Sequence, residues 1–508
     1  MMTQLKKNFY QSASGYRIAF WSVLLVGIVF IASSYPMMKL RFDIWQHVGN
    51  IDILVFNPDA KVVRSNWHST WAFVLRMIGA KDVFAYAVII HRVQFVLNCI
   101  IIYFASRLLF SALLPAADIM NSRSDASRKH WLSSLAISSV LVWLTIIGTV
   151  STFQQAWIMW YSVNYQITLP ILFLALALLV NGVAMSQSRK IVVMKLCGSL
   201  VLLTLIYFYH AGELAYLVFY IPILLICFTT KKNYKNTLIL MMLSLLIVLV
   251  GAKFYSDIVP GLIKLIKAGD WHQIKQRINI DGLYNIQGGN RYLANWNELY
   301  ALSVLLVVPT AMLVWTKRVY FNQRVFFFIA LSLVFCFIPT FKYSAGIASL
   351  ISYDGIVNRY YFASFVFMML PMVAYSIVWN VKLLRQPIIL IAIVMVLMGL
   401  VFSYSRSINH GGIYYQNIKS IRDSLYQDRV GLDMPAIEVE SIGRQIDVAD
   451  KKYGADQIIF CANYDKSHIV RYVYRKENIL FHRGHLLISL DQCRDYAKSK
   501  NKLAIVID

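Results

Sequence analysis

Charged residues are scarce in this chain. Only 15% of its 508 residues are Asp, Glu, Lys or Arg, whereas 58% are hydrophobic and the mean hydropathy is +0.58. Soluble globular proteins carry about 25% charged and about 45–50% apolar residues, so this composition excludes an ordinary soluble enzyme. The many apolar and aromatic side chains also exclude a disordered chain. The composition predicts a polytopic membrane protein.

Acidic residues are the scarcer of the two charge types, and several functional motifs are missing. Against 49 Lys and Arg there are 25 Asp and Glu, which gives a formal net charge of +24. In a soluble protein this excess would suggest nucleic-acid binding, but here the positive residues lie between apolar runs and so indicate membrane topology. The chain has no CxxC or HExxH spacing, no P-loop and no dinucleotide fingerprint, so no motif supports a zinc or nucleotide site.

Long apolar runs recur along the first four-fifths of the chain. Each is long enough, or nearly so, to cross about 30 Å of hydrocarbon as a helix. We predict eleven spans, at residues 18–38, 83–110, 131–150, 164–184, 192–209, 214–228, 237–254, 299–315, 325–341, 360–379 and 387–404. The fifth and sixth form one run that is broken only by the polar segment from His210 to Glu213, which predicts a tight helical hairpin.

The basic residues set the orientation. If the N-terminus is cytoplasmic, every inside segment carries Lys or Arg, as the positive-inside rule requires. The residues concerned are Lys6, Lys7, Arg17, Arg123, Arg128, Lys129, Arg189, Lys190, Lys195, Lys231, Lys232, Lys235, Lys317, Arg318, Arg324, Lys382 and Arg385. Eleven crossings then place the tail, residues 405–508, outside the cytoplasm.

The tail has the composition of a soluble domain. Residues 405–508 carry 16 Lys and Arg and 13 Asp and Glu. A helical apolar period over 434–453 and compact β-rich runs at 457–461 and 503–507 predict a small α/β domain. The expected fold is therefore an all-α polytopic membrane module over residues 1–404 with a C-terminal α/β extracytoplasmic domain.

Two long outer loops, residues 39–82 and 255–298, are candidates for function, because loops of this length in a compact protein are usually functional or disordered. The first begins with Asp43 and His47, which share one face if the segment is helical. It continues with four further polar or aromatic candidates, Asp52, Arg64, Trp67 and His68. An ordinary interfacial loop, with a solvated acid and a Trp anchor, explains the same residues.

Other candidates lie at the outer ends of later spans. A carboxylate beside hydrocarbon is costly, so it needs a pairing partner or a functional role. His210 is a possible structural partner for Glu213. Arg359, with Asp354 five residues before it, could clamp a lipid phosphate or could simply extend to head groups. Arg291 in the second long loop is a weaker candidate of the same kind.

The six cysteines fall into two groups. Four lie within predicted spans, where they serve as small apolar packing residues. Cys461 and Cys493 lie in the tail, where an oxidising compartment favours a disulfide between them, with two buried thiols as the alternative.

This arrangement resembles the GT-C class of membrane glycosyltransferases, and most of all the phage-type serotype-converting O-antigen glucosyltransferases. The likeness rests on many spans, a long first outer loop with interfacial helices, an outer C-terminal domain and the stretch Phe42-Asp43-Ile44-Trp45-Gln46-His47. It implies that Asp43 is the catalytic base. Ile44 follows Asp43, so the adjacent acidic pair of some relatives is absent, and we expect no metal.

The resemblance also implies the substrates. The donor would be a polyprenyl-phosphate sugar and the acceptor a lipid-linked glycan, so no cofactor and no nucleic acid are expected. Arg359 and Arg64 would hold phosphate. The remaining candidates for sugar or phosphate contacts are His47, Asp52, Trp67, His68, His210, Glu213, Arg291 and Asp354.

Two other functions stay open at this point. An O-antigen polymerase or ligase would use the same lipid, although those enzymes usually rely on periplasmic arginines and lack an added α/β domain. A transporter or lipid flippase would show inverted repeats and polar residues deep within spans. No repeat is evident, and His91 and Arg92 are the polar residues we place deepest.

The odd number of spans yields a prediction about the C-terminus. We expect alkaline phosphatase fused after residue 508 to be active, because the enzyme folds only outside the cytoplasm. A GFP fused at the same point and exported through the general secretory pathway should be dark. The opposite pattern would mean that one span is miscounted, most readily in the run 192–228.

Overall fold

The computed structural model describes part of the chain, in ranges separated by gaps. The described residues are 42–58, 66–80, 83–114, 125–149, 164–185, 188–229, 267–269, 321–338, 344, 348, 360, 362–381, 384–409, 436–462, 466, 469–470, 474, 476, 478–479 and 490–507. They are mostly helical.

The chain divides into two compact units. We call the first the helical unit; it comprises Met1–Ile28, Phe95–Trp160 and Tyr165–Gln416. The second, which we call the mixed unit, comprises Val29–Gln94, Tyr161–Asn164 and Asn417–Asp508. Helix α5, Val83–Leu113, continues from the mixed unit into the helical unit. The predicted domain boundary after residue 404 lies inside a helix, and residues 410–435 lie outside the described residues.

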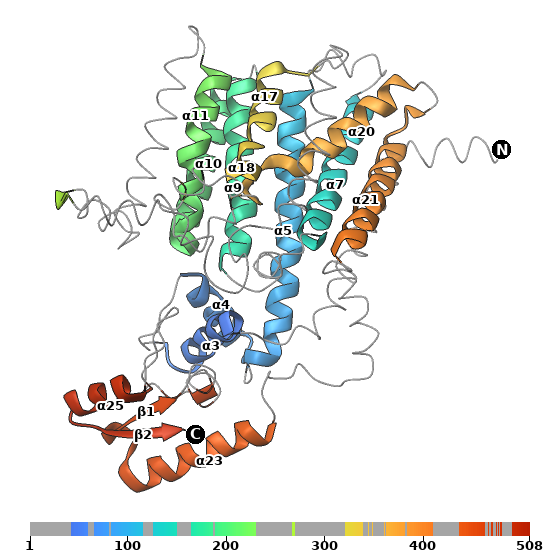
Figure 1. Cartoon of the computed structure of the whole chain (residues 1–508). Helices are drawn as coiled ribbons and strands as arrows, with labels where there is room; N and C mark the ends of the chain where they lie inside the picture. Colours follow the sequence, from blue (N-terminus) through green and yellow to red (C-terminus); the bar gives the residue numbers. More distant parts are fainter. Residues whose placement is uncertain are drawn as a thin grey trace. The chain divides into compact units, whose positions relative to one another are not determined.

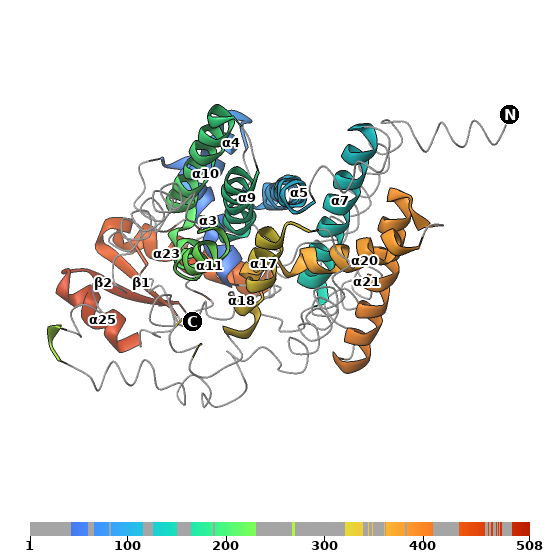
Figure 2. The ribbon, with the colours of Figure 1, turned by 90° about the horizontal axis from the view of Figure 1, so that it is seen from above.

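The helical unit is a bundle, and Figure 2 shows several of its helices nearly end-on. After α5 its described elements are α7 (Asp125–Thr149), α9 (Asn164–Ala184), α10 (Arg189–His210), η2 (Ala211–Tyr216), α11 (Leu217–Phe228), α17 (Gln323–Leu331), α18 (Val334–Phe337), η5 (Phe365–Met368), α20 (Met369–Asn380) and α21 (Pro387–Asn409) (Figure 1).

Three of these helices are long and apolar enough to cross a membrane, by length and composition. They contain Val96–Leu113, Ile167–Ala184 and Arg189–His210. Shorter apolar helices occupy Gly212–Phe228, Gln323–Phe337, Phe365–Trp379 and Pro387–Leu400. Helices therefore lie at eight of the eleven predicted spans, and the other three, 18–38, 237–254 and 299–315, fall outside the described residues. The count of eleven stays a prediction.

Two predicted spans are interrupted, for different reasons. At His210 the backbone becomes extended, with φ −163° and ψ 96°, and a 3-10 helix follows before α11 begins. This break matches the polar segment in the sequence. The predicted span 325–341 is broken at Ser332 between α17 and α18, where the Ser332 hydroxyl accepts a hydrogen bond from the Phe365 N–H at 3.0 Å.

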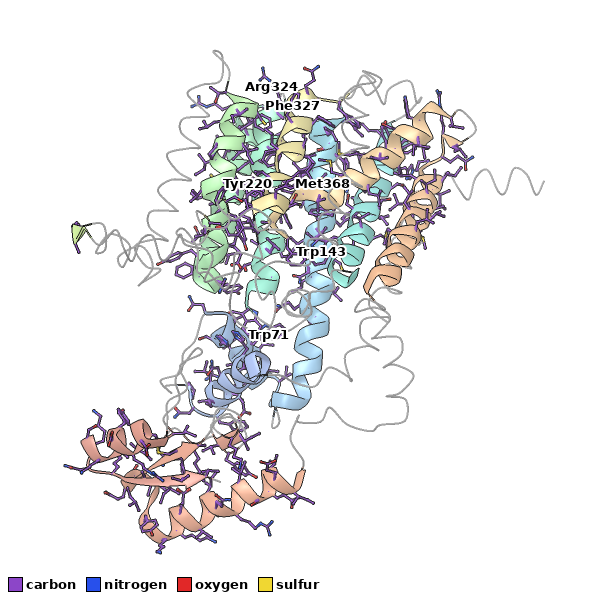
Figure 3. All side chains as sticks on the ribbon, viewed as in Figure 1. Trp71, Trp143, Tyr220, Arg324, Phe327 and Met368 are labelled. Atoms are coloured by element: carbon purple, nitrogen blue, oxygen red, sulfur yellow. A yellow bond between two sulfur atoms is a disulfide. The ribbon has the colours of Figure 1, made fainter. Side chains whose placement is uncertain are left out.

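Aromatic side chains form much of the core of the helical unit. Phe173, Tyr220, Phe335 and Phe365 are fully buried, and Tyr220 packs against Phe335 with ring centroids 4.5 Å apart. The Tyr220 hydroxyl donates to the Ala363 carbonyl, so its polar end is satisfied within the core. Figure 3 shows Tyr220 and Met368 inside the unit, whereas Arg324 lies at its end.

The tail part of the mixed unit is an α/β structure. Its described elements are α23 (Ala436–Tyr453), η7 (Ala455–Gln457), β1 (Ile458–Ala462), α25 (Leu490–Ser499) and β2 (Leu503–Ile507). The strands β1 and β2 are parallel, with Ile458 opposite Leu503, and Phe460 forms a further parallel bridge with Ile479. Parallel strands need a crossover connection, and α25 lies in the segment that joins these two.

Strand β1 is buried on both faces, which places it between two helical layers. Ile458 and Phe460 pack in one cluster with Ile442 and Ile446 of α23. Ile459 and Cys461 face the other way, in a cluster with Cys493 and Ala497 of α25. This alternation is what a strand with a side-chain period of two produces, and it explains why the sequence run is continuously apolar.

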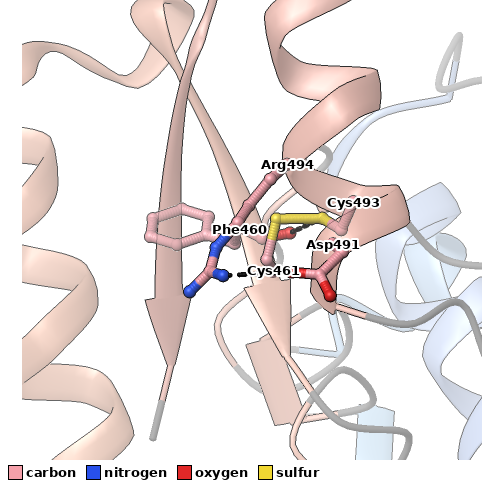
Figure 4. Close-up of a disulfide and its surroundings, with 5 residues drawn as sticks. All are labelled: Phe460, Cys461, Asp491, Cys493 and Arg494. Carbon is pink, nitrogen blue, oxygen red and sulfur yellow. Dashed lines mark hydrogen bonds and ion pairs between the residues drawn. A yellow bond between two sulfur atoms is a disulfide. The ribbon is translucent and has the colours of Figure 1, made fainter.

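A disulfide joins the central strand to one of its covering helices. Cys461 of β1 and Cys493 of α25 are bonded, with their Cα atoms 5.9 Å apart and both side chains buried (Figure 4). This is the pair expected from the sequence. On the exposed side of α25, Arg494 donates to the Asp491 carboxylate at 3.2 Å.

A glycine in α23 provides room for a tyrosine ring. The Tyr474 hydroxyl donates to the Val439 carbonyl at 2.7 Å, and the ring lies against Gly443. A Cβ atom at residue 443 would come within 2.6 Å of Cζ of this ring. Partial burial, followed by the carboxylates of Asp447 and Glu440, raises the pKa of Tyr474, so its hydroxyl stays protonated and able to donate at neutral pH.

We therefore expect Gly443→Ala to destabilise α23. Alanine is the better helix former by about 1 kcal/mol, but overpacking against Tyr474 should outweigh this and leave a net loss of about 1–2 kcal/mol. Hydrogen–deuterium exchange of residues 436–453 in the detergent-solubilised full chain should show faster opening. Gly399→Ala in α21, where no atom lies near the added methyl, is the matched control and should be neutral or stabilising. Equal behaviour of the two variants would contradict the packing described here.

Candidate functional site

Helices α3 (Phe42–Phe56) and α4 (Asn66–Met77) occupy the predicted first outer loop and pack against each other. Helix α4 buries one face, formed by Trp67, His68, Ala72 and Leu75. It ends at Gly79, whose φ of +67° is in the left-handed region, and the Ala80 N–H donates back to the Leu75 carbonyl at 2.9 Å. This is a Schellman ending, which glycine allows without strain.

A histidine pair joins the two helices. His47 Nδ1 of α3 and His68 Nε2 of α4 are 2.7 Å apart, and the two rings are nearly parallel, with an interplanar angle of 5°. A neutral imidazole has one N–H and one acceptor nitrogen, so one ring donates and the other accepts. If both rings were protonated, both nitrogens would be donors and this hydrogen bond would be lost. The pair can therefore hold or pass on a single proton.

The buried indole of Trp67 packs against this pair and fixes it to a third helix. Its ring meets His47 and His68 edge-on, with centroids 6.0 Å and 5.1 Å away. Its Nε1–H donates to Oε1 of Gln94 in α5 at 3.0 Å. Because only 1% of Trp67 is exposed, it is not the interfacial anchor that the simpler interpretation of the loop assumed. A direct contact with substrate would require its neighbours to move.

The two acidic residues of α3 occupy different positions. The backbone of Asp43 lies in the first turn, four residues before His47, so the segment is helical as the sequence argument required, and the Asp43 side chain lies outside the described residues. Asp52 is fully buried and so is not a solvated acid. A buried carboxylate must be hydrogen-bonded or paired to be tolerated, which gives Asp52 a structural role at this helix interface.

The helical unit contains a second polar pair. His210 Nδ1 and Glu213 Oε2 are 2.6 Å apart, at the break between α10 and η2. The Glu213 side chain is 5% exposed and the His210 side chain 22% exposed. The pair matches the partnership considered from the sequence, in which the imidazole balances a carboxylate beside an apolar helix.

Some of the predicted site residues lie in contact with one another, and others are not among the residues that the structure describes. His47, Trp67 and His68 form one cluster, and His210 and Glu213 form a pair in the other unit. Arg64, Arg291, Asp354 and Arg359 lie outside the described residues, as do the side chains of Asp43, His91 and Arg92. Among the residues that are described, no group of His, Cys, Asp and Glu could hold a metal ion.

Sequence reasoning missed Gln94. This residue is fully buried in the N-terminal half of α5 and accepts a hydrogen bond from the Trp67 indole N–H. A signal was present, because an amide within a long apolar helix is costly unless it is paired. The predicted span 83–110 contains Gln94, but only His91 and Arg92 were named as its polar residues, so no partner in the preceding loop was sought for Gln94.

Comparison with known proteins adds no assignment to this geometry. No protein-family model matches the chain, no curated protein matches it, and no solved structure matches it.

The contact between His210 and Glu213 leads to a prediction about the stability of the protein. Replacing His210 with Ala leaves the Glu213 carboxylate nearly buried without this imidazole, and we expect a loss of about 1–3 kcal/mol. Heat tolerance of the detergent-solubilised protein should fall, and adding Glu213→Gln should restore part of it. Thr204→Ala, at an exposed position of α10, is the control. A His210→Ala variant as heat-tolerant as this control would contradict the structural role.

Proposed function

We propose that the chain is an integral membrane glycosyltransferase. It moves a sugar, glucose in our proposal, from a polyprenyl-phosphate donor such as undecaprenyl phosphate to a cell-surface glycan such as the O-antigen of lipopolysaccharide. The reaction takes place on the outer face of the bacterial inner membrane. The chain crosses the membrane many times, with its N-terminus in the cytoplasm and its C-terminal domain in the periplasm.

One observation supports this proposal, namely the helical spacing by which Asp43 comes one turn before a histidine that belongs to a hydrogen-bonded pair. Asp43 lies in the first turn of α3, one turn before His47, and His47 is hydrogen-bonded to His68. A carboxylate and two imidazoles are the side chains most suited to accept and pass on a proton near neutral pH. They lie on helices that precede the apolar window of α5, where a lipid-linked head group would be presented.

The chemistry requires one proton acceptor and one site for a leaving phosphate. In a single displacement, the acceptor hydroxyl oxygen bonds to the anomeric carbon while the bond from that carbon to the phosphate oxygen breaks, which inverts the anomeric centre. Asp43 takes the hydroxyl proton, and the leaving phosphate keeps the bonding electron pair. In this proposal Arg359 and Arg64 stabilise its charge. No protein nucleophile is needed.

The α/β tail supports the proposal as a site for the acceptor glycan. Its sheet is covered on both faces by helices, and a disulfide fixes α25 to the central strand. A disulfide is expected in an oxidising compartment such as the periplasm, which agrees with an outer location for the tail.

The decisive test is Asp43→Asn. The amide keeps the shape of the carboxylate but cannot take the proton of the acceptor hydroxyl, and general-base catalysis contributes about 10²–10⁴-fold. We therefore expect glycosyl transfer to fall by that factor or more at unchanged expression. Purified protein would be assayed with a lipid-phosphate sugar and a glycan acceptor.

Lys190→Gln is the control for this test. It also replaces a charged side chain with an amide, at an exposed position of α10 on the side that we predict to be cytoplasmic, and it should leave turnover unchanged. Near-normal turnover by Asp43→Asn would remove the case for this residue and favour a transporter or ligase instead.

A further inference from the structure

An enclosed aromatic cluster lies where α7 begins and α20 ends, at the end of the helical unit that we predict to be cytoplasmic. Trp131 of α7 meets Tyr375 and Trp379 of α20 edge-on, with ring centroids 5.3 Å and 6.2 Å away. The two α20 rings stack, with their centroids 5.6 Å apart. Trp131 is 3% exposed and Tyr375 is 7% exposed, so these rings join helices and do not form a lipid-facing aromatic belt.

Two arginines are attached to this cluster. Arg385 follows α20 and lies over the Trp379 ring, 5.6 Å from its centroid, and its Nε–H donates to the Trp379 carbonyl at 3.3 Å. Arg128 comes one turn before Trp131 on α7, and its Nε–H is shielded from solvent without a hydrogen-bond partner. Among the residues described, neither guanidinium forms an ion pair with a carboxylate. A shielded N–H without an acceptor is costly, so this corner suits an anionic ligand.

The same corner lies at the ends of two apolar helices. One apolar helix, Phe365–Trp379, ends in the cluster, and the next, Pro387–Leu400, begins just after Arg385. Helices α20 and α21 pack against each other, and both pack against α7 (Figure 2). Three exposed apolar side chains border the turn between α20 and α21, at 44%, 41% and 37% exposed: Ile377, Val381 and Ile388. Such a surface favours a ligand that has a hydrocarbon chain as well as an anionic head.

We propose that this corner of the helical unit binds an anionic phospholipid of the cytoplasmic leaflet, such as phosphatidylglycerol or cardiolipin. The phosphate is held by Arg128 and Arg385, and an acyl chain lies along Ile377 and Val381. Guanidinium groups bind phosphate bidentately, and basic sites between membrane helices bind anionic head groups. The proposal is independent of glycosyl transfer, because it concerns the opposite side of the membrane from the proposed reaction.

Native mass spectrometry of the delipidated full chain in detergent can test this site. Phosphatidylglycerol and phosphatidylethanolamine with the same acyl chains would be titrated separately, and we expect the anionic lipid to bind more tightly. Arg128→Gln/Arg385→Gln removes both guanidinium groups, so it should weaken phosphatidylglycerol binding by about tenfold or more and abolish the preference. The matched control is Arg189→Gln/Lys190→Gln. It removes two charges at exposed positions of α10, on the side that we predict to be cytoplasmic, and should bind like the unmodified chain.

A further variant covers failure of the Gln pair to insert or fold. Arg128→Lys/Arg385→Lys keeps the charges that set orientation but loses the planar donor groups, so phosphatidylglycerol binding should again weaken by about tenfold. Binding as tight as in the unmodified chain would overturn the proposal. An equal loss in the α10 control would also overturn it, because attraction would then be general.

Competition with glycerol 3-phosphate distinguishes a lipid from a free phosphate compound. We expect no displacement of phosphatidylglycerol by an equal concentration of glycerol 3-phosphate, because the soluble compound lacks the acyl chains that contact Ile377 and Val381. Displacement would overturn the assignment to lipid. Equal binding of phosphatidylglycerol and phosphatidylethanolamine by the unmodified chain would overturn the assignment to an anionic head group. No turnover is measured, so failure here is distinct from failure of the Asp43 test.

Discussion

The hydrogen bond from the Trp67 indole to Gln94 is the contact on which the described site depends. It gives the buried amide of Gln94, in a largely apolar helix, a hydrogen-bond donor, and so holds α4 at one level of α5. Since His68 follows Trp67 directly, the same contact sets the position of the histidine pair. His47 then orients α3, whose first turn contains Asp43. Two side-chain hydrogen bonds, His47–His68 and Trp67–Gln94, thus link α3 to α4 and α4 to α5.

The same rule, that a buried polar group must have a partner, accounts for the irregular points of the helical unit. At His210 the helix breaks where an imidazole meets the Glu213 carboxylate. At Ser332 it breaks where a hydroxyl accepts from the Phe365 N–H and so satisfies the start of η5. Asn181 likewise donates to the Leu108 carbonyl at 2.6 Å and links α9 to α5. Each of these contacts is stronger than it would be in water, because the surroundings of the polar groups are largely apolar.

The sequence predicted those features that depend on neighbouring residues. Apolar period and length predicted the helices at eight spans and α23, the polar segment from His210 predicted the break there, and compact β-rich runs predicted β1 and β2. Features that depend on distant residues were missed. Ser332 is a single hydroxyl in an apolar run, and its partner lies 33 residues away. The pairing of Gln94 could not be predicted without knowing that Trp67, 27 residues earlier, is buried and not interfacial.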